Sequence, residues 1–145
     1  MINRKNVITV RMPYPNMSSN LAIKSHMYIC WKNVDHDVSI IKCQTLKPYM
    51  ILNNVIDHYV DEEADISRNP FKHATRIDCD KVFKTKRVLY PMQLCTSSRN
   101  DVCEDTMLKV EDELYRNNHI VYPSLNEADM LNLNPLLKAI KFSNN

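Results

Sequence analysis

The chain contains no glycine among its 145 residues, and this absence limits both its turns and its possible ligand loops. Glycine-rich phosphate loops and the dinucleotide-binding fingerprint need glycine where the backbone approaches a phosphate group, so neither is possible here. Turns must instead use asparagine, aspartate and proline, which tolerate left-handed or preset backbone dihedrals. We therefore expect turns at Asn, Asp and Pro clusters such as residues 33–37.

The first fifty residues predict three strands of one sheet. Residues 7–14 alternate between apolar and polar side chains, as in a strand with one buried face. Residues 27–31 are a short apolar run, which is typical of a strand covered on both faces. Residues 38–46 are rich in β-branched side chains, which favour a third strand.

A candidate site lies where these predicted strands meet their loops. The first loop, residues 13–24, is long for a hairpin and rich in small polar side chains, and such loops on rigid sheets often bind ligands. The third strand ends on Gln44 and Thr45, with Lys47 just beyond, although a buried strand end needs no polar groups. We therefore expect the loop and this strand end to form a polar site.

The middle of the chain predicts one short helix and two further strands. Apolar residues between positions 51 and 60 recur at helical spacing. Residues 61–65 are acidic, and we interpret them as a solvated loop because a metal site would need carboxylates from elsewhere. Residues 76–83 predict a strand, and residues 88–94 predict an edge strand because Pro91 interrupts them.

An amphipathic helix follows, with Ser98 or Asn100 as its expected N-cap. It ends near residues 117–118. Its apolar stripe consists of Cys103, Met107, Val110 and Leu114.

Short helical elements are predicted near the C-terminus. Ser124 and Glu127 have capping-box spacing, and Asn134 precedes Pro135 as at the start of another helical turn. We therefore divide the chain into a sheet domain of residues 1–118 and a helical appendage of residues 119–145.

Composition indicates a globular protein of one domain's length, with 44% hydrophobic and 25% charged residues. The net charge of +2 neither requires nor excludes a nucleic-acid partner. The five cysteines are scattered and odd in number, so we expect buried apolar side chains rather than a zinc site or a disulfide framework. No signal peptide or transmembrane run is evident, so we expect a cytoplasmic protein without membrane contact.

The order of these elements resembles the MazF/PemK family of toxin endoribonucleases. A strand ending in proline, a long polar loop, an apolar strand and a strand ending in threonine are followed by residues 75–83, a basic turn and the amphipathic helix. The resemblance covers residues 6–117. It implies an α+β fold that is mainly β, with a small, strongly bent, SH3-like antiparallel sheet. It also implies a homodimer that cleaves single-stranded RNA with no metal or other cofactor.

The resemblance also implies site positions. Members of the family place arginine after the first loop, usually followed by proline, and threonine or serine at the end of the third strand. Here Lys24 and His26 lie after the loop and Thr45 ends the strand, with His26 at the arginine position and Met27 at the proline position.

RNA cleavage without a metal needs a base for the 2′-hydroxyl proton, an acid for the leaving 5′-oxygen and donors for the charged phosphorane. His26 suits proton transfer, Lys24 supplies positive charge, and Thr45 donates a hydrogen bond. The expected product end is a 2′,3′-cyclic phosphate. The expected RNA contacts are Arg11, Tyr14, Ser18, Ser19, Asn20, Gln44 and Lys47.

Two alternatives stay open, because each of these residues also has an ordinary structural role in a sheet protein. One is a non-catalytic relative of phage or mobile-element origin that binds nucleic acid or a protein. The other is a small partner-modulating protein whose C-terminal helices are the working part. For a toxin, the expected protein partner is an antitoxin that covers the first loop and Thr45.

Overall fold

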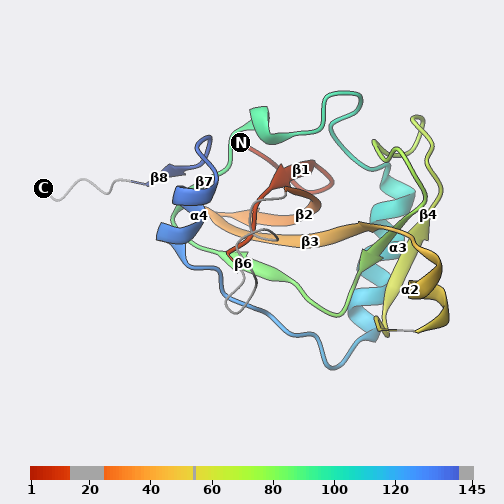
Figure 1. The fold of residues 1–145 in the computed structure, drawn as a ribbon. Coiled ribbons are helices and arrows are strands. Elements are labelled where there is room, and N and C mark those ends of the chain that lie inside the picture. Colours follow the sequence, from red (N-terminus) through yellow and green to blue (C-terminus); the bar gives the residue numbers. More distant parts are fainter. Residues whose placement is uncertain (14–24, 54, 141–145) are drawn as a thin grey trace, which may run out of the picture.

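The computed structural model describes residues 1–13, 25–53 and 55–140, and its centre is an antiparallel sheet (Figure 1). Strands β1 (Val7–Val10), β2 (His26–Val34) and β3 (Asp37–Thr45) pair in chain order. The three strands predicted from the first fifty residues are therefore confirmed. The β1 ladder ends at Val10, but the alternation continues through an exposed Arg11 and a buried Met12.

The other edge of β3 pairs with two successive strands instead of the single strand predicted at residues 76–83. These are β5 (Thr75–Asp78) and β6 (Phe83–Thr85). The chain leaves the ladder between them because the Asp78 side chain accepts a hydrogen bond of 2.8 Å from the amide of Asp80, as in an Asx turn. This turn makes Asp78 the last residue of β5.

The predicted helix at residues 51–60 is wrong in its second half. Helix α2 (Pro48–Leu52) is a little more than one turn long, and β4 (Tyr59–Glu62) is an edge strand paired with β5. Pairing satisfies the backbone groups along the outer edge of β5, which outweighs the helical spacing of the apolar residues. The predicted acidic loop at residues 61–65 therefore begins inside a strand.

Both faces of the sheet are buried. On β2, Tyr28 and Cys30 belong to one apolar cluster, whereas Ile29 and Trp31 belong to a second cluster on the opposite face. The prediction that this strand is covered on both faces is confirmed. Of the cysteines, Cys30, Cys43 and Cys79 are buried and all five are free thiols.

Helices α3 (Glu104–Arg116) and α4 (Glu127–Leu133) lie at opposite ends of the sheet (Figure 1). The apolar stripe of α3 packs into the second cluster through Met107, Val110 and Leu114. The predicted N-cap is wrong: Cys103 precedes α3, and the carbonyl of Asn100 instead accepts a hydrogen bond of 2.9 Å from the amide of Val7. The segment before α3 that contains Asn100 thus lies along the outer edge of β1.

Up to residue 140, the C-terminal part contains helix α4 and one strand. Asn126, not Ser124, caps α4 by accepting a hydrogen bond of 3.0 Å from the amide of Asp129. At Pro135 the chain forms a single turn, in which the amide of Leu137 donates a hydrogen bond of 3.0 Å to the carbonyl of Asn134. It does not continue as a helix, because β8 (Lys138–Ala139) follows and pairs with β7 (Val88–Leu89). The predicted edge strand at residues 88–94 is accordingly shortened to β7 and a 3-10 turn, η1 (Met92–Leu94).

The protein is a small α+β protein dominated by antiparallel sheet, with few short helices. In the described ranges the sheet is open, and β1 and β4 are its end strands. Among the same residues, no helix is both long enough and apolar enough to span a bilayer.

Candidate functional site

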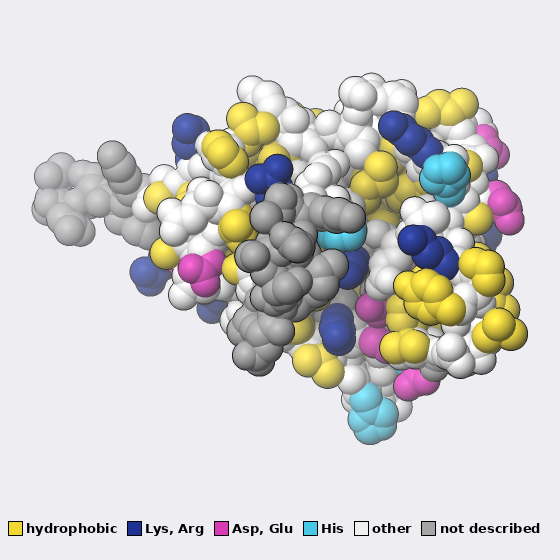
Figure 2. Space-filling view, viewed as in Figure 1, with side chains coloured by type: hydrophobic (Ala, Val, Ile, Leu, Met, Phe, Trp, Pro, Cys, Tyr) yellow, Lys and Arg dark blue, Asp and Glu magenta, His cyan; other side chains and the backbone are white. Residues whose placement is uncertain are grey.

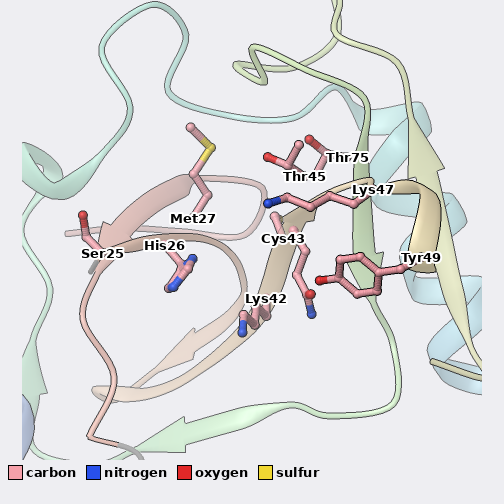
Figure 3. Close-up of a pocket in the computed structure, with 10 residues that line it drawn as sticks. Ser25, His26, Met27, Lys42, Cys43, Thr45, Lys47, Tyr49 and Thr75 are labelled. Carbon is pink, nitrogen blue, oxygen red and sulfur yellow. The ribbon is translucent and has the colours of Figure 1, made fainter. Parts of the chain in front are cut away.

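An open pocket of about 370 Å³ lies where β2 begins and β3 ends (Figure 3). The antiparallel register places these two ends together, because Met27 pairs with Cys43 and Tyr28 pairs with Lys42. The residues lining the pocket are Ser25, His26, Met27, Lys42, Cys43, Gln44, Thr45, Lys47, Tyr49 and Thr75. Four residues expected at the site from the sequence, His26, Gln44, Thr45 and Lys47, are therefore gathered in one place.

Strand alternation separates these side chains into two groups. His26 and Lys42 point to one side of the β2–β3 pair, and Met27 and Thr45 point to the other (Figure 3). Gln44 is two residues from Lys42 and shares its side. The residues best placed to act together are thus His26, Lys42 and Gln44, while Thr45 lies across the strand from His26.

A second pocket of about 260 Å³ continues from the first, because Gln44 and Tyr49 line both. The register of β3 with β5 pairs Cys43 with Ile77, which brings Lys42 opposite Asp78. Asp78 is 7% exposed, and this burial raises the pKa of its carboxyl group. Burial lowers the pKa of the Lys42 ammonium group, against the opposing effect of the Asp78 charge.

Arg76 also lines the second pocket, and its guanidinium group is bound to neighbouring residues of the protein. Its guanidinium group donates to both carboxylate oxygens of Asp61, at 2.8 and 2.9 Å, and to the carbonyl of Met50 at 3.2 Å. It also stacks 3.7 Å from the centre of the Tyr59 ring. Arg76 thus fixes α2 and β4 against β5 and positions the wall on which Tyr49 lies.

Positive and histidine side chains gather in the middle of this face, with acidic side chains beside them (Figure 2). Arg11 is exposed and lines a neighbouring shallow hollow that shares Ser25 with the first pocket. The other expected contacts, Tyr14, Ser18, Ser19, Asn20 and Lys24, lie outside the described residues.

Three side chains of the site were missed by reasoning from sequence: Lys42, Tyr49 and Asp78. Lys42 interrupts an apolar strand, which is a visible signal of a polar position on the sheet. That Lys42 lies opposite Asp78 depends on the pairing of β3 with β5, which are more than thirty residues apart in the sequence at this point.

The described residues contain no group of three or more His, Cys, Asp or Glu side chains placed to hold a metal ion. No protein-family model, curated protein or solved structure matches the chain.

Proposed function

We propose that the pocket binds single-stranded RNA and that His26 promotes cleavage of its backbone by the 2′-hydroxyl group. The observation that carries this proposal is that His26, Lys42 and Gln44 share one side of the β2–β3 pair in an open pocket rimmed by Lys47 and Tyr49. Imidazole, ammonium and amide groups are together sufficient for proton transfer and for stabilising a charged phosphate.

In the proposed reaction, neutral His26 accepts the proton of the 2′-hydroxyl group as its oxygen attacks the adjacent phosphorus. The bond from phosphorus to the 5′-oxygen breaks, and the leaving oxygen takes a proton from the Lys42 ammonium group. The lowered pKa of Lys42 makes it a better proton donor than an exposed lysine. Lys47 and Gln44 stabilise the phosphorane, and the products are a 2′,3′-cyclic phosphate and a 5′-hydroxyl end.

The same proposal includes a divergent MazF/PemK-like, SH3-like fold. Its support is the element order along the chain and the irregular register between Cys30 and Lys32 of β2, since a β-bulge bends a sheet. The partners that follow from this resemblance are a second copy of the chain and an antitoxin segment that competes with RNA for the pocket.

A non-catalytic RNA-binding module is the second candidate. It is favoured by the direction of Thr45, because the hydroxyl group expected to assist His26 points to the other side of β3 (Figure 3). Such a module needs the lysines and Tyr49 for binding, but not a proton acceptor at position 26.

Incubation of the full chain with long single-stranded RNA in EDTA separates these candidates. We expect fragments with 2′,3′-cyclic phosphate ends, and we expect His26→Ala to reduce the cleavage rate roughly 10²- to 10⁴-fold, the usual contribution of general acid–base catalysis. His119→Ala is the matched control because His119 is exposed and does not line the pocket, and it should cleave at the natural rate.

Binding of the same RNA is measured in parallel. RNA that binds but stays intact supports the non-catalytic module. Equal cleavage by His26→Ala and the natural chain would remove His26 from the mechanism.

A further inference from the structure

We propose that the second pocket is a base-binding subsite selective for guanine, with the Asp78 carboxylate as the group that reads the base. This inference rests on the proposed function, because the pocket adjoins the place where the RNA phosphate is expected. It goes further by naming the nucleotide recognised and the residue that selects it.

The walls of the second pocket suit a flat aromatic ring. Met50, Val55 and Ile56 supply apolar surface, and Tyr49 lies at the junction with the first pocket. A splayed nucleotide with its phosphate beside Lys42 and Lys47 can therefore place its base between Tyr49 and this apolar wall. Stacking on aromatic side chains is the usual way in which proteins hold bases of single-stranded RNA.

Of the two acidic groups that line this pocket, Asp78 has the greater capacity left for a ligand. Asp80 also lines the pocket, but its two carboxylate oxygens accept hydrogen bonds from the amides of Asp57 and His58, at 2.9 and 3.0 Å. Asp78 accepts a bond from the amide of Asp80 on one of its oxygens, so more of its roughly four lone-pair positions remain for a ligand than on Asp80.

A buried carboxylate favours guanine over the other three bases. Guanine presents two adjacent donors, the N1–H and the 2-amino group, which match the two oxygens of a carboxylate. Adenine and cytosine present a single donor beside an acceptor nitrogen, and uracil presents its N–H between two carbonyl oxygens, so each of these places an acceptor against Asp78.

The remaining polar groups of the pocket complete this match. Gln44 and Lys81 line the pocket with Asp78, and both can donate hydrogen bonds. A guanine that presents its donors to Asp78 has an acceptor, O6, on the same edge. The amide group of Gln44 or the ammonium group of Lys81 can donate a hydrogen bond to O6. Asp78 as acceptor, with Gln44 and Lys81 as donors beside the apolar wall, is therefore complementary to the Watson–Crick edge of guanine.

The test compares guanosine and inosine monophosphates by calorimetric titration of the full chain, because inosine differs from guanosine only by lacking the 2-amino group. Both the 3′- and the 5′-monophosphates are used, with the adenosine, cytidine and uridine monophosphates alongside. We expect guanosine to bind about tenfold or more tightly than inosine and the other nucleotides, since one good bidentate pair discriminates by that order.

Asp78→Asn is the informative variant. Its amide oxygen can still accept the hydrogen bond from Asp80 and keep the turn, but its NH₂ group opposes the guanine donors. We expect this variant to bind guanosine and inosine equally, whereas Asp112→Asn, an exposed substitution on α3, keeps the preference of the natural chain. Circular dichroism of both variants checks that the fold is intact.

Equal affinities of the natural chain for all five bases would overturn the subsite, as would a guanosine preference that survives in Asp78→Asn. The positions of RNA breaks distinguish this failure from that of the proposed function. Breaks without relation to guanosine remove the subsite and leave the nuclease. Asp78-dependent guanosine binding by a chain that leaves RNA intact keeps the subsite and removes the nuclease.

Discussion

The direction of single side chains decides the chemistry of this site. His26, Lys42 and Gln44 come together because they lie on one side of two antiparallel strands, and Thr45 is separated from them by a single step along β3. A sequence position near a site therefore does not establish that a side chain takes part in it. For this reason Lys42, which has no role in the site predicted from the sequence, is grouped with His26, and Thr45, which was expected to act with His26, is not.

Asp78 links the stability of the protein to its proposed role. Its carboxyl pKa is raised by burial, so the charged form is less stable in the folded chain than in the unfolded chain. This unfavourable contribution is present at neutral pH and is relieved as the pH falls through the pKa of Asp78 in the folded chain. The ionised Asp78 carboxylate thus lowers the stability of the folded chain, as is common for groups that bind a ligand.

We therefore expect Asp78→Asn to unfold at a higher temperature than the natural chain at pH 7. The difference should shrink as the pH falls, because the natural carboxyl group then becomes neutral as well. Thermal unfolding followed by circular dichroism between pH 7 and pH 3 measures this. Asp112→Asn should change stability by less than about 0.5 kcal/mol, since its pair with Arg116 is exposed. A lower unfolding temperature for Asp78→Asn at pH 7 would contradict this account.

Helix α4 is tied to the sheet by specific contacts. Met130 is fully buried in the cluster shared with β1 and β2. Asn134, which follows α4, accepts a hydrogen bond of 2.8 Å from the amide of Arg11 and donates one of 2.9 Å to its carbonyl. The Asn134 side chain thus pairs with the backbone of Arg11, just beyond β1, in the way that a neighbouring strand would. Both residues line the shallow hollow beside the first pocket.

Met130→Ala should lower the free energy of unfolding by about 2–5 kcal/mol, the usual cost of truncating a buried methionine. Met92→Ala is the matched control, because Met92 is 40% exposed, and it should cost under about 1 kcal/mol. Chemical denaturation measures both. The sequence pattern treats residues 119–145 as an appendage to the sheet domain, whereas these contacts predict that removing them costs at least as much as Met130→Ala. Unfolding of Met130→Ala at the same denaturant concentration as the natural chain would contradict this prediction.

Elements with a clear local pattern could be predicted from the sequence. The first three strands follow from alternation and β-branched runs, and the α3 stripe follows from its spacing. The region around Tyr59 could not, because its apolar residues fit helical spacing and its final structure depends on the open edge of β5. The cap of α4 was misplaced because Ser124 and Asn126 both suit the position, and the cap of α3 was misplaced because that helix begins after Cys103 without a side-chain cap.

At the scale of the whole molecule, two pockets form one polar surface across the ends of β2, β3 and β5 (Figure 2). The sequence indicated one part of this surface, since His26, Gln44, Thr45 and Lys47 all line the first pocket. It did not indicate the second pocket, because Asp78 reaches Gln44 only through the pairing of β3 with β5. Local sequence patterns thus predict the strand ends that line the first pocket, whereas the second pocket depends on the long-range pairing of β3 with β5.

The measurement that tests the central claim most directly is a titration of the natural chain with an RNA oligomer, followed through the ring resonances of its five histidines. The oligomer carries fluorine in place of every 2′-hydroxyl group, so it binds without being cleaved. We predict that the His26 resonances shift until they saturate. His36, in the turn at the far end of β2, and His119, beyond α3, should keep their resonances unchanged. Saturation of the protein with oligomer while His26 stays unchanged would show that RNA binds elsewhere and would contradict the account.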